Sequence, residues 1–265
     1  MEKRRLAIIA LLVVVIICGA VWNNYWQNRS HSLSASGNIE AVEVVVSSKV
    51  VGRVTNINVD EGSTVTVGQI IAQIEKPDYY AALQSAKSRQ TLAKSDYYRN
   101  KKLFDQGLVS DQQMQTAISN VDSATSGLQN AQSQFDNTDI KAPIDGVVLV
   151  KAIEAGELAT VGTPIVTMAN LKELNLRVYV DEVSYGKISL GEGVLVSVDS
   201  FPKEKFKGTV TYISNQAEFT PKSIQTKDER VAQVFAIKIK IANPELKLKP
   251  GMPADAQFLQ SGDGL

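Results

Sequence analysis

The sequence has almost none of the residues that build catalytic and metal sites. Its 265 residues include one cysteine, Cys18, and one histidine, His31. A single cysteine forms no disulfide within the chain, and a single histidine makes neither a zinc site nor a catalytic triad. We therefore expect no catalytic residue, no metal ligand and no cofactor, and we predict that the protein is not an enzyme.

An excess of charge of either sign is also absent. Lysine and arginine together number 28, as do aspartate and glutamate, so the formal net charge is zero. A nucleic-acid partner is not expected, because binding phosphates requires a surplus of basic residues. The hydrophobic fraction of 44% is enough to build a folded core.

The long hydrophobic segment lies near the N-terminus. Residues Leu6 to Trp22 carry no charge, basic residues 3–5 precede them, and Trp26 follows in a short aromatic stretch. This pattern predicts a single transmembrane anchor with its N-terminus in the cytoplasm and the bulk of the chain exported across the membrane. The alternative is a cleaved signal peptide, for which residues 18–20 provide small side chains at a cleavage site.

A repeat of glycines marks two related segments. The three glycines of each copy match at a constant offset of 94 residues, Gly52, Gly62 and Gly68 in one and Gly146, Gly156 and Gly162 in the other. Each copy is typical of short strands joined by turns, with glycine where a positive φ is needed. Two copies facing each other are predicted to close one small β-sandwich.

Residues between the two copies have a helical pattern. Apolar or small residues alternate at spacings of three and four, and the predicted seam is Tyr79, Leu83, Ala86, Gln90, Ala93, Tyr97, Asn100 and Phe104 in the first arm, and Met114, Ala117, Val121, Ala124, Leu128, Ala131 and Phe135 in the second. Gly107 is expected to end the first helix and Ser110 to cap the second. A hairpin of two helices follows, about 40 Å long at 1.5 Å per residue.

The C-terminal third changes to alternating strands. Five or six short strands and one short helix over residues 181–188 predict a small antiparallel β-barrel, with a long loop over residues 215–230. The expected fold is therefore mainly β with an α-helical coiled-coil hairpin. The expected domains are residues 1–27 cytoplasmic flank and anchor, 28–42 linker and first barrel or membrane-proximal strand, 43–77 first lipoyl-like half, 78–137 hairpin, 138–172 second lipoyl-like half, and 173–260 barrel and membrane-proximal return.

Together these features resemble membrane fusion proteins of the HlyD type, which are periplasmic adaptors. The two glycine segments look like the halves of a lipoyl or biotinyl carrier domain, and the stretch from Leu248 to Pro253 matches the family's closing motif. The resemblance implies an adaptor that joins an inner-membrane exporter to a TolC-like outer-membrane channel for efflux or secretion. It also implies a homo-oligomer, expected to be a hexamer.

The hairpin turn carries a further resemblance. Arg99, Leu103 and Ser110 have the spacing Arg-x3-Leu-x6-Ser, which is similar to the tip motif that adaptors of this family use against TolC-type ducts, and Gly107 lies in the same turn. Residues 218–230 are similar to adaptors of ABC exporters, so an ABC permease with its ATPase is the expected partner. Short loops near residues 76–77 and 170–171 are expected to act as hinges.

Alternatives differ in partner and in class. The adaptor could serve a proton-driven resistance-nodulation-division (RND) pump instead of an ABC exporter. A lipoylated or biotinylated carrier would need a modifiable lysine on a tight turn between the two halves, and the helical hairpin replaces that turn here. A hydrolase would need a base, and His31 stands beside the predicted anchor.

Overall fold

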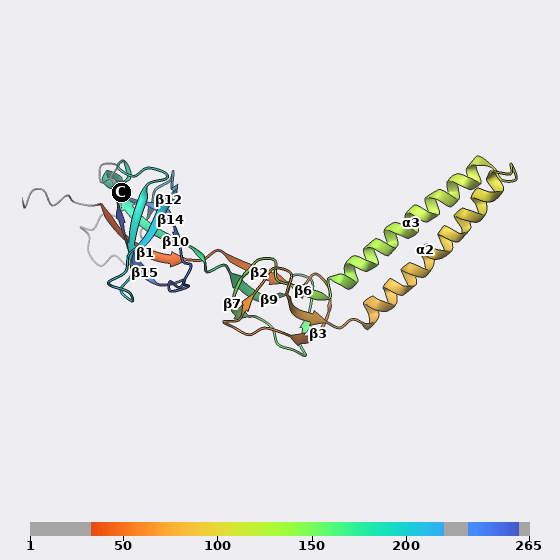
Figure 1. The fold of residues 1–265 in the computed structure, drawn as a ribbon, viewed down its shortest axis with the longest axis horizontal. Coiled ribbons are helices and arrows are strands. Elements are labelled where there is room, and N and C mark those ends of the chain that lie inside the picture. Colours follow the sequence, from red (N-terminus) through yellow and green to blue (C-terminus); the bar gives the residue numbers. More distant parts are fainter. Residues whose placement is uncertain (1–32, 220–232, 260–265) are drawn as a thin grey trace, which may run out of the picture. The chain divides into compact units, whose positions relative to one another are not determined.

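A computed structural model describes residues 33–219 and 233–259 of the chain (Figure 1). The predicted anchor residues Leu6, Trp22 and Trp26 lie outside these ranges, as do Cys18 and His31. Within them, no helix combines the length and the apolar character that crossing a membrane requires. The chain folds as two compact units, of which one comprises Ala41–Leu174 with Asn243–Lys249 and the other contains the barrel strands.

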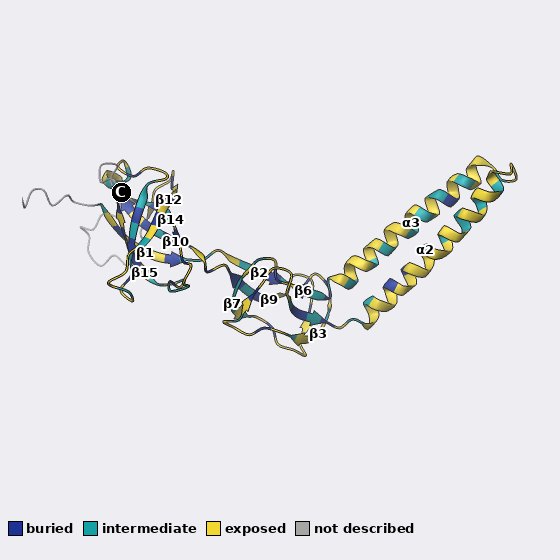
Figure 2. Cartoon of the chain, viewed as in Figure 1, coloured by how far each residue is buried: buried dark blue, intermediate teal, exposed yellow. Residues whose placement is uncertain are grey.

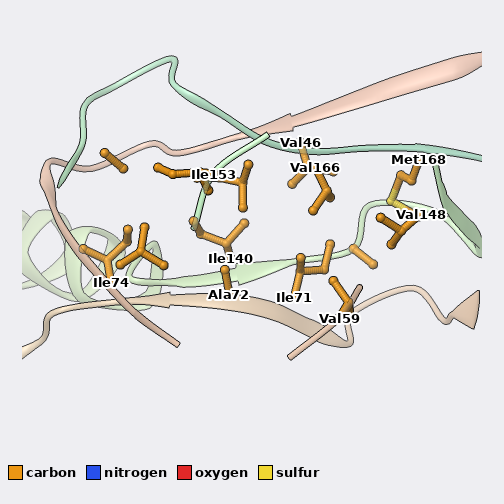
Figure 3. Close-up of a cluster of buried hydrophobic side chains, with 14 of the residues drawn as sticks. Val46, Val59, Ile71, Ala72, Ile74, Ile140, Val148, Ile153, Val166 and Met168 are labelled. Atoms are coloured by element: carbon orange, nitrogen blue, oxygen red, sulfur yellow. The ribbon is translucent and has the colours of Figure 1, made fainter. Parts of the chain in front are cut away.

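The first unit contains a sandwich of two four-stranded sheets, in the orders β2-β9-β7-β4 and β6-β5-β3-β8. Its strands are β2 (Glu43–Ser47), β3 (Gly52–Ile57), β4 (Thr64–Val65), β5 (Ile70–Ile74), β6 (Asp139–Lys141), β7 (Gly146–Lys151), β8 (Leu158–Ala159) and β9 (Pro164–Ala169). Side chains from both sheets, among them Ile71, Ile74, Val166 and Met168, are fully buried between them (Figure 3). The β-sandwich expected from the glycine repeat is confirmed.

The sequence repeat appears in the sandwich as a pseudo-twofold arrangement. Replacing each strand of one sheet by its repeat partner gives the other sheet, so each sheet contains strands from both halves. The turn hydrogen bonds repeat in the same way, because the N–H of Gly62 donates to Val148 O and the N–H of Gly156 donates to Val54 O, both at 2.8 Å. Neither half can complete a sheet alone, which explains why the two copies occur together.

The repeated glycines serve two different purposes. The second and third glycines of each copy have a positive φ, for example +84° at Gly62 and +98° at Gly156, as the turn requires. The first glycine serves close packing instead. A methyl group on Gly52 would lie 2.5 Å from the Ile74 side chain, and one on Gly146 would lie 2.4 Å from a backbone oxygen of β9. For Gly146 the expectation of a positive φ is therefore wrong.

Two long helices, α2 (Pro77–Phe104) and α3 (Asp111–Asp136), leave the sandwich between β5 and β6. Most residues of the predicted seam face the partner helix, but only a few of them are buried. Leu83, Ala86 and Ala117 are buried, whereas most of the helical surface is exposed (Figure 2). At the far end the prediction is wrong by one residue, since Leu103 is partly buried and Phe104 is exposed. Phe104 is the last helical residue, so the seam ends one position earlier.

The second unit is a small closed barrel. Six strands form the ring, namely β1 (Ser34–Glu40), β10 (Glu173–Asp181), β11 (Gly193–Ser197), β12 (Phe206–Ile213), β14 (Gln233–Ala242) and β15 (Pro253–Phe258), and a β10–β14 pairing closes it. Strand β14 alternates as expected, with Ile237, Ile239 and Ile241 fully buried. The mainly β fold with a helical hairpin is confirmed.

The short helix expected in the barrel is present with narrower bounds, and the expected loop is interrupted by a strand. The helix expected over residues 181–188 is only four residues long, α4 (Glu182–Tyr185), because Asp181 is its N-cap and Gly186 ends it. The expected loop over residues 215–230 contains a short strand, β13 (Glu218–Phe219), which pairs with the start of β14. Residues 220–230 of that loop lie outside the described ranges.

Candidate docking site at the hairpin tip

The hairpin turn is built by a glycine that ends α2. Gly107 has φ +71°, its N–H donates to Phe104 O at 2.8 Å, and the N–H of Leu108 donates to Leu103 O at 2.9 Å. These two bonds form a Schellman motif, which satisfies carbonyl groups that the helix end would otherwise leave unpaired. The expected glycine cap is confirmed, and it fixes the direction in which the chain leaves α2.

Ser110 begins the returning helix with a capping box. Its Oγ accepts from the N–H of Gln113 at 3.3 Å, and the Gln113 side chain accepts from the Ser110 N–H at 3.1 Å. The reciprocal bonds satisfy two backbone donors at the helix start. The turn between the two caps is therefore short and held at both sides, which makes the tip a defined surface.

Arg99 lies about one helical turn before Leu103 and points its charged end outward. Its guanidinium is 3.1 Å from Asp96 on the same helix, and its side chain is 69% exposed. An exposed pair of this kind contributes little to stability. Because a guanidinium has five N–H donors, Arg99 retains donors for an acceptor on another molecule.

A groove of about 950 Å³ lies along one face of the hairpin near its tip. It is lined by residues of both helices, and these include Arg99, Ser110 and the exposed Leu92. Among the predicted tip residues, the structure therefore brings Arg99 and Ser110 to one groove. Leu103 and Gly107 do not line it.

One exposed tip residue is missing from the sequence prediction. Leu108 follows Gly107 and is 68% exposed, which makes it the most exposed large hydrophobic residue of the described hairpin. A Schellman motif favours an apolar residue directly after its glycine. That preference was the signal in the sequence, and the predicted spacing motif does not include this position.

Several contacts fix the root of the hairpin to the sandwich. The Lys76 Nζ is 2.7 Å from the Asp139 carboxylate, and the Tyr79 hydroxyl donates to Val51 O at 2.7 Å. Lys76 also lies over the Phe135 ring, 5.8 Å from its centroid. Burial would raise the pKa of the Asp139 carboxyl, but hydrogen bonds from Lys76 and Gln73 and the Lys76 charge lower this pKa below its ordinary value.

The same lysine bears on the carrier alternative. In this chain β5 leads through Lys76 directly into α2, so no tight turn joins the two halves. The ammonium group of Lys76 is held by Asp139 and only a third of its side chain is exposed. This geometry does not resemble a lysine presented for modification at the end of a free turn.

Comparisons with known sequences agree with this architecture. Residues 42–169, the sandwich with its hairpin, match a family described as the barrel-sandwich hybrid domain of RND membrane fusion proteins. Residues 174–257 match a family described as the YknX-like beta-barrel domain. Together the two matches cover most of the described chain. The protein belongs to the membrane fusion proteins. These are periplasmic adaptors of efflux systems and are not enzymes.

Individual relatives extend over nearly the whole chain. The membrane protein YbhG of Salmonella typhi is 27% identical over 95% of this chain and 95% of its own. Among solved structures, a MacA–MexA chimera that contains the Pseudomonas aeruginosa MexA α-hairpin has a TM-score of 0.74 at 24% identity, and covers 86% of this chain and 82% of its own. The membrane fusion protein Spr0693 of Streptococcus pneumoniae R6 has a TM-score of 0.69 at 20% identity, over 87% and 100%.

Proposed function

We propose that the protein is a HlyD-type adaptor that joins an ABC exporter of the inner membrane to a TolC-like channel of the outer membrane. In this proposal the segment from Leu6 to Trp22 anchors the chain in the inner membrane, with Trp26 at the periplasmic interface. The hairpin carries the channel-docking end. The observation that supports the proposal most is the tip, where two caps hold a short turn that presents exposed polar and apolar groups.

The tip combines the features that a protein contact needs. Arg99 supplies a planar, charged donor group, and Leu108 supplies an exposed apolar side chain. Arginine is among the residues that dominate the energetics of many interfaces, and an exposed apolar side chain contributes free energy when a partner removes it from water. Gly107 and Ser110 hold the turn, and Leu103 accepts the bond that positions Leu108. We assign the docking role to these residues together with the predicted motif.

The thin packing of the hairpin supports a homo-oligomer, for which we propose six copies. Its seam includes polar side chains, such as Gln90, which donates to the Thr125 hydroxyl at 3.1 Å. A two-helix pair with so few buried residues gains little from its own interface. Lateral contacts with hairpins of neighbouring copies would stabilise it.

Two observations bear on the transporter class. Residues 218–230 resemble adaptors of ABC exporters, which favours an ABC partner. The family that matches the sandwich is described as a domain of RND membrane fusion proteins, which favours a proton-driven RND pump as the second candidate. Identification of the transporter that co-purifies with the protein decides between them.

Site-specific photo-crosslinking in cells tests the docking role of the tip. A photoreactive residue is placed at Leu108 and, as a matched control, at the exposed Gln84 near the hairpin root. We expect a crosslink to an outer-membrane channel from position 108 and none from position 84. Arg99→Glu should weaken the crosslink from position 108. Equal labelling from both positions, or a position-108 crosslink only to other proteins, would refute the docking role.

A further inference from the structure

Exposed large hydrophobic residues of the barrel are not scattered over its surface. Among the described barrel residues there are four, Tyr179, Val183, Leu190 and Tyr212. The strand register decides whether they share one end of the barrel, because each strand pairing places specific residues side by side.

The register places these residues at the end where β1 begins. Strand β10 runs antiparallel to β1 with Val178 beside Gly37, so β10 reaches its last residues, and then α4, beside the start of β1. On the other side, Ser34 pairs with Gln257 of β15, and Gln257 pairs with Leu195 of β11. The turn that precedes β11 therefore lies at this same end. Gly193 of β11 pairs with Thr209 of the antiparallel strand β12, so Tyr212, which follows Thr209, also lies toward this end.

Two of the four residues are held rigidly in this position. The Tyr185 ring of α4 packs on the Phe235 ring of β14 with centroids 4.4 Å apart, which fixes the helix that carries Val183. The N–H of Gly191 donates to Val210 O at 2.9 Å, which fixes the turn that carries Leu190. Val183 is 73% exposed and Leu190 is 66% exposed. These apolar side chains are thus held in solvent by packed structure.

The sequence before β1 indicates what this end faces. Eleven residues separate Trp22, the last residue of the apolar segment, from Ser34 at the start of β1. Fully extended, they span at most about 40 Å. The end of the barrel that carries the exposed hydrophobic residues is therefore the end that the chain tethers to the apolar segment.

We propose that Val183, Leu190 and Tyr212 form a membrane-contact surface that inserts into the headgroup boundary of the phospholipid bilayer holding the anchor. This inference rests on the anchor of the proposed function. The charged residues around this surface are acidic at Asp181, Glu182 and Glu192 and basic at Lys187 and Lys238, and the Lys238 Nζ lies 5.4 Å from the centroid of the Tyr212 ring. These residues give no basic excess. Apolar insertion, rather than attraction to anionic lipid, holds the surface on the membrane.

The test uses the full-length chain in phospholipid vesicles, with Cys18→Ala so that one introduced thiol carries an environment-sensitive fluorophore. The probe is placed at Leu190→Cys and, as a control, at Leu158→Cys in β8, which is 64% exposed. We expect a blue-shifted emission and quenching by nitroxide-labelled lipid at position 190, and neither at position 158. Both effects should be equal in pure phosphatidylcholine and in its mixture with phosphatidylglycerol.

A second variant tests the surface as a unit. Val183→Asp, with the probe at position 190, should reduce the quenching while circular dichroism shows an intact fold. A chain that floats with the vesicles but leaves the position-190 probe in water overturns the inference. Shielding that requires a co-reconstituted transporter, without lipid quenching, also overturns it in favour of a protein partner. A chain that does not float refutes the anchor, and with it both this inference and the membrane part of the proposed function.

Discussion

Asn243 forms the best-connected buried polar site in the described chain. Only 1% of its surface is exposed, and its side chain makes three hydrogen bonds. Its Nδ2 donates to Leu171 O at 2.8 Å and to Leu248 O at 3.0 Å, and its Oδ1 accepts from the Leu248 N–H at 3.0 Å. These bonds join the chain that leaves β9 to the loop Asn243–Lys249, which contains Leu246 in a left-handed conformation at φ 55°.

We expect Asn243→Ala to destabilise the protein by about 3 kcal/mol, since each lost hydrogen bond contributes about 1 kcal/mol net and buried groups left unpaired add to the cost. For a chain of this size the melting temperature would fall by roughly 6–12 °C. Asn243→Asp should cost at least as much. It retains an acceptor for the Leu248 N–H but places a carboxylate against two carbonyl oxygens.

Urea and thermal unfolding of the wild type and both variants measure this effect. Asn170→Ala is the matched control, because Asn170 is an exposed asparagine nearby whose side chain accepts one bond, from the Lys172 N–H at 3.0 Å. The control should lose about 1 kcal/mol or less. A loss below about 1 kcal/mol for Asn243→Ala, or an Asn243→Asp variant as stable as the wild type, would contradict the assignment of Asn243 as the site that holds this loop.

Three further substitutions test other parts of the account. Gly146→Ala should destabilise by about 1–3 kcal/mol, since the added methyl group would lie 2.4 Å from a backbone oxygen, whereas Gly127→Ala in the open surface of α3 should be neutral or slightly stabilising in the same unfolding assay. Asp139→Asn should destabilise at pH 7. Lys76 lowers the pKa of Asp139, so the difference in the free energy of unfolding between wild type and this variant should shrink as the pH falls below about 4 and through that lowered pKa. A difference that stays constant from pH 7 to pH 2 would refute the ion pair. Gly107→Ala, at φ +71°, should cost about 1–2 kcal/mol and speed amide exchange at the tip, and unchanged exchange would show that the turn does not depend on glycine.

Much of the architecture follows from the sequence because it is periodic. A constant offset of 94 residues identifies two halves that need each other, and heptad spacing identifies helices that must pair. The caps at Gly107 and Ser110 are equally local, since the turn geometry is specified by residues within one turn. Each of these features depends on neighbours that lie close in the sequence or at a fixed distance.

The details that sequence reasoning missed depend on tertiary neighbours. Gly146 has an ordinary φ, and only the approach of β9 explains why a side chain is excluded there. Leu108 lies outside both the heptad pattern and the predicted spacing motif, and its 68% exposure is a property of the folded turn. The clustering of Val183 and Leu190 requires the strand register, because the two residues belong to different connections of the barrel.

The root of the hairpin bears on where an adaptor of this type can bend. Residues near 76–77 were expected to form a hinge, yet Lys76 is bound to Asp139 and Tyr79 is bound to Val51 O. Motion at this point would break both contacts. We predict that such motion requires loss of the ion pair, and that the hairpin of Asp139→Asn moves more freely relative to the sandwich, which spin-label distances between the two can measure.

The measurement that tests the central claim most directly is crosslinking in cells, purification of the C-terminally tagged protein from membranes, and mass spectrometry of the proteins that accompany it. The account predicts an ABC permease with its ATPase together with a TolC-like channel. A proton-driven pump with such a channel would retain the adaptor and overturn the ABC assignment. Recovery of neither a transporter nor a channel would contradict the proposed function as a whole.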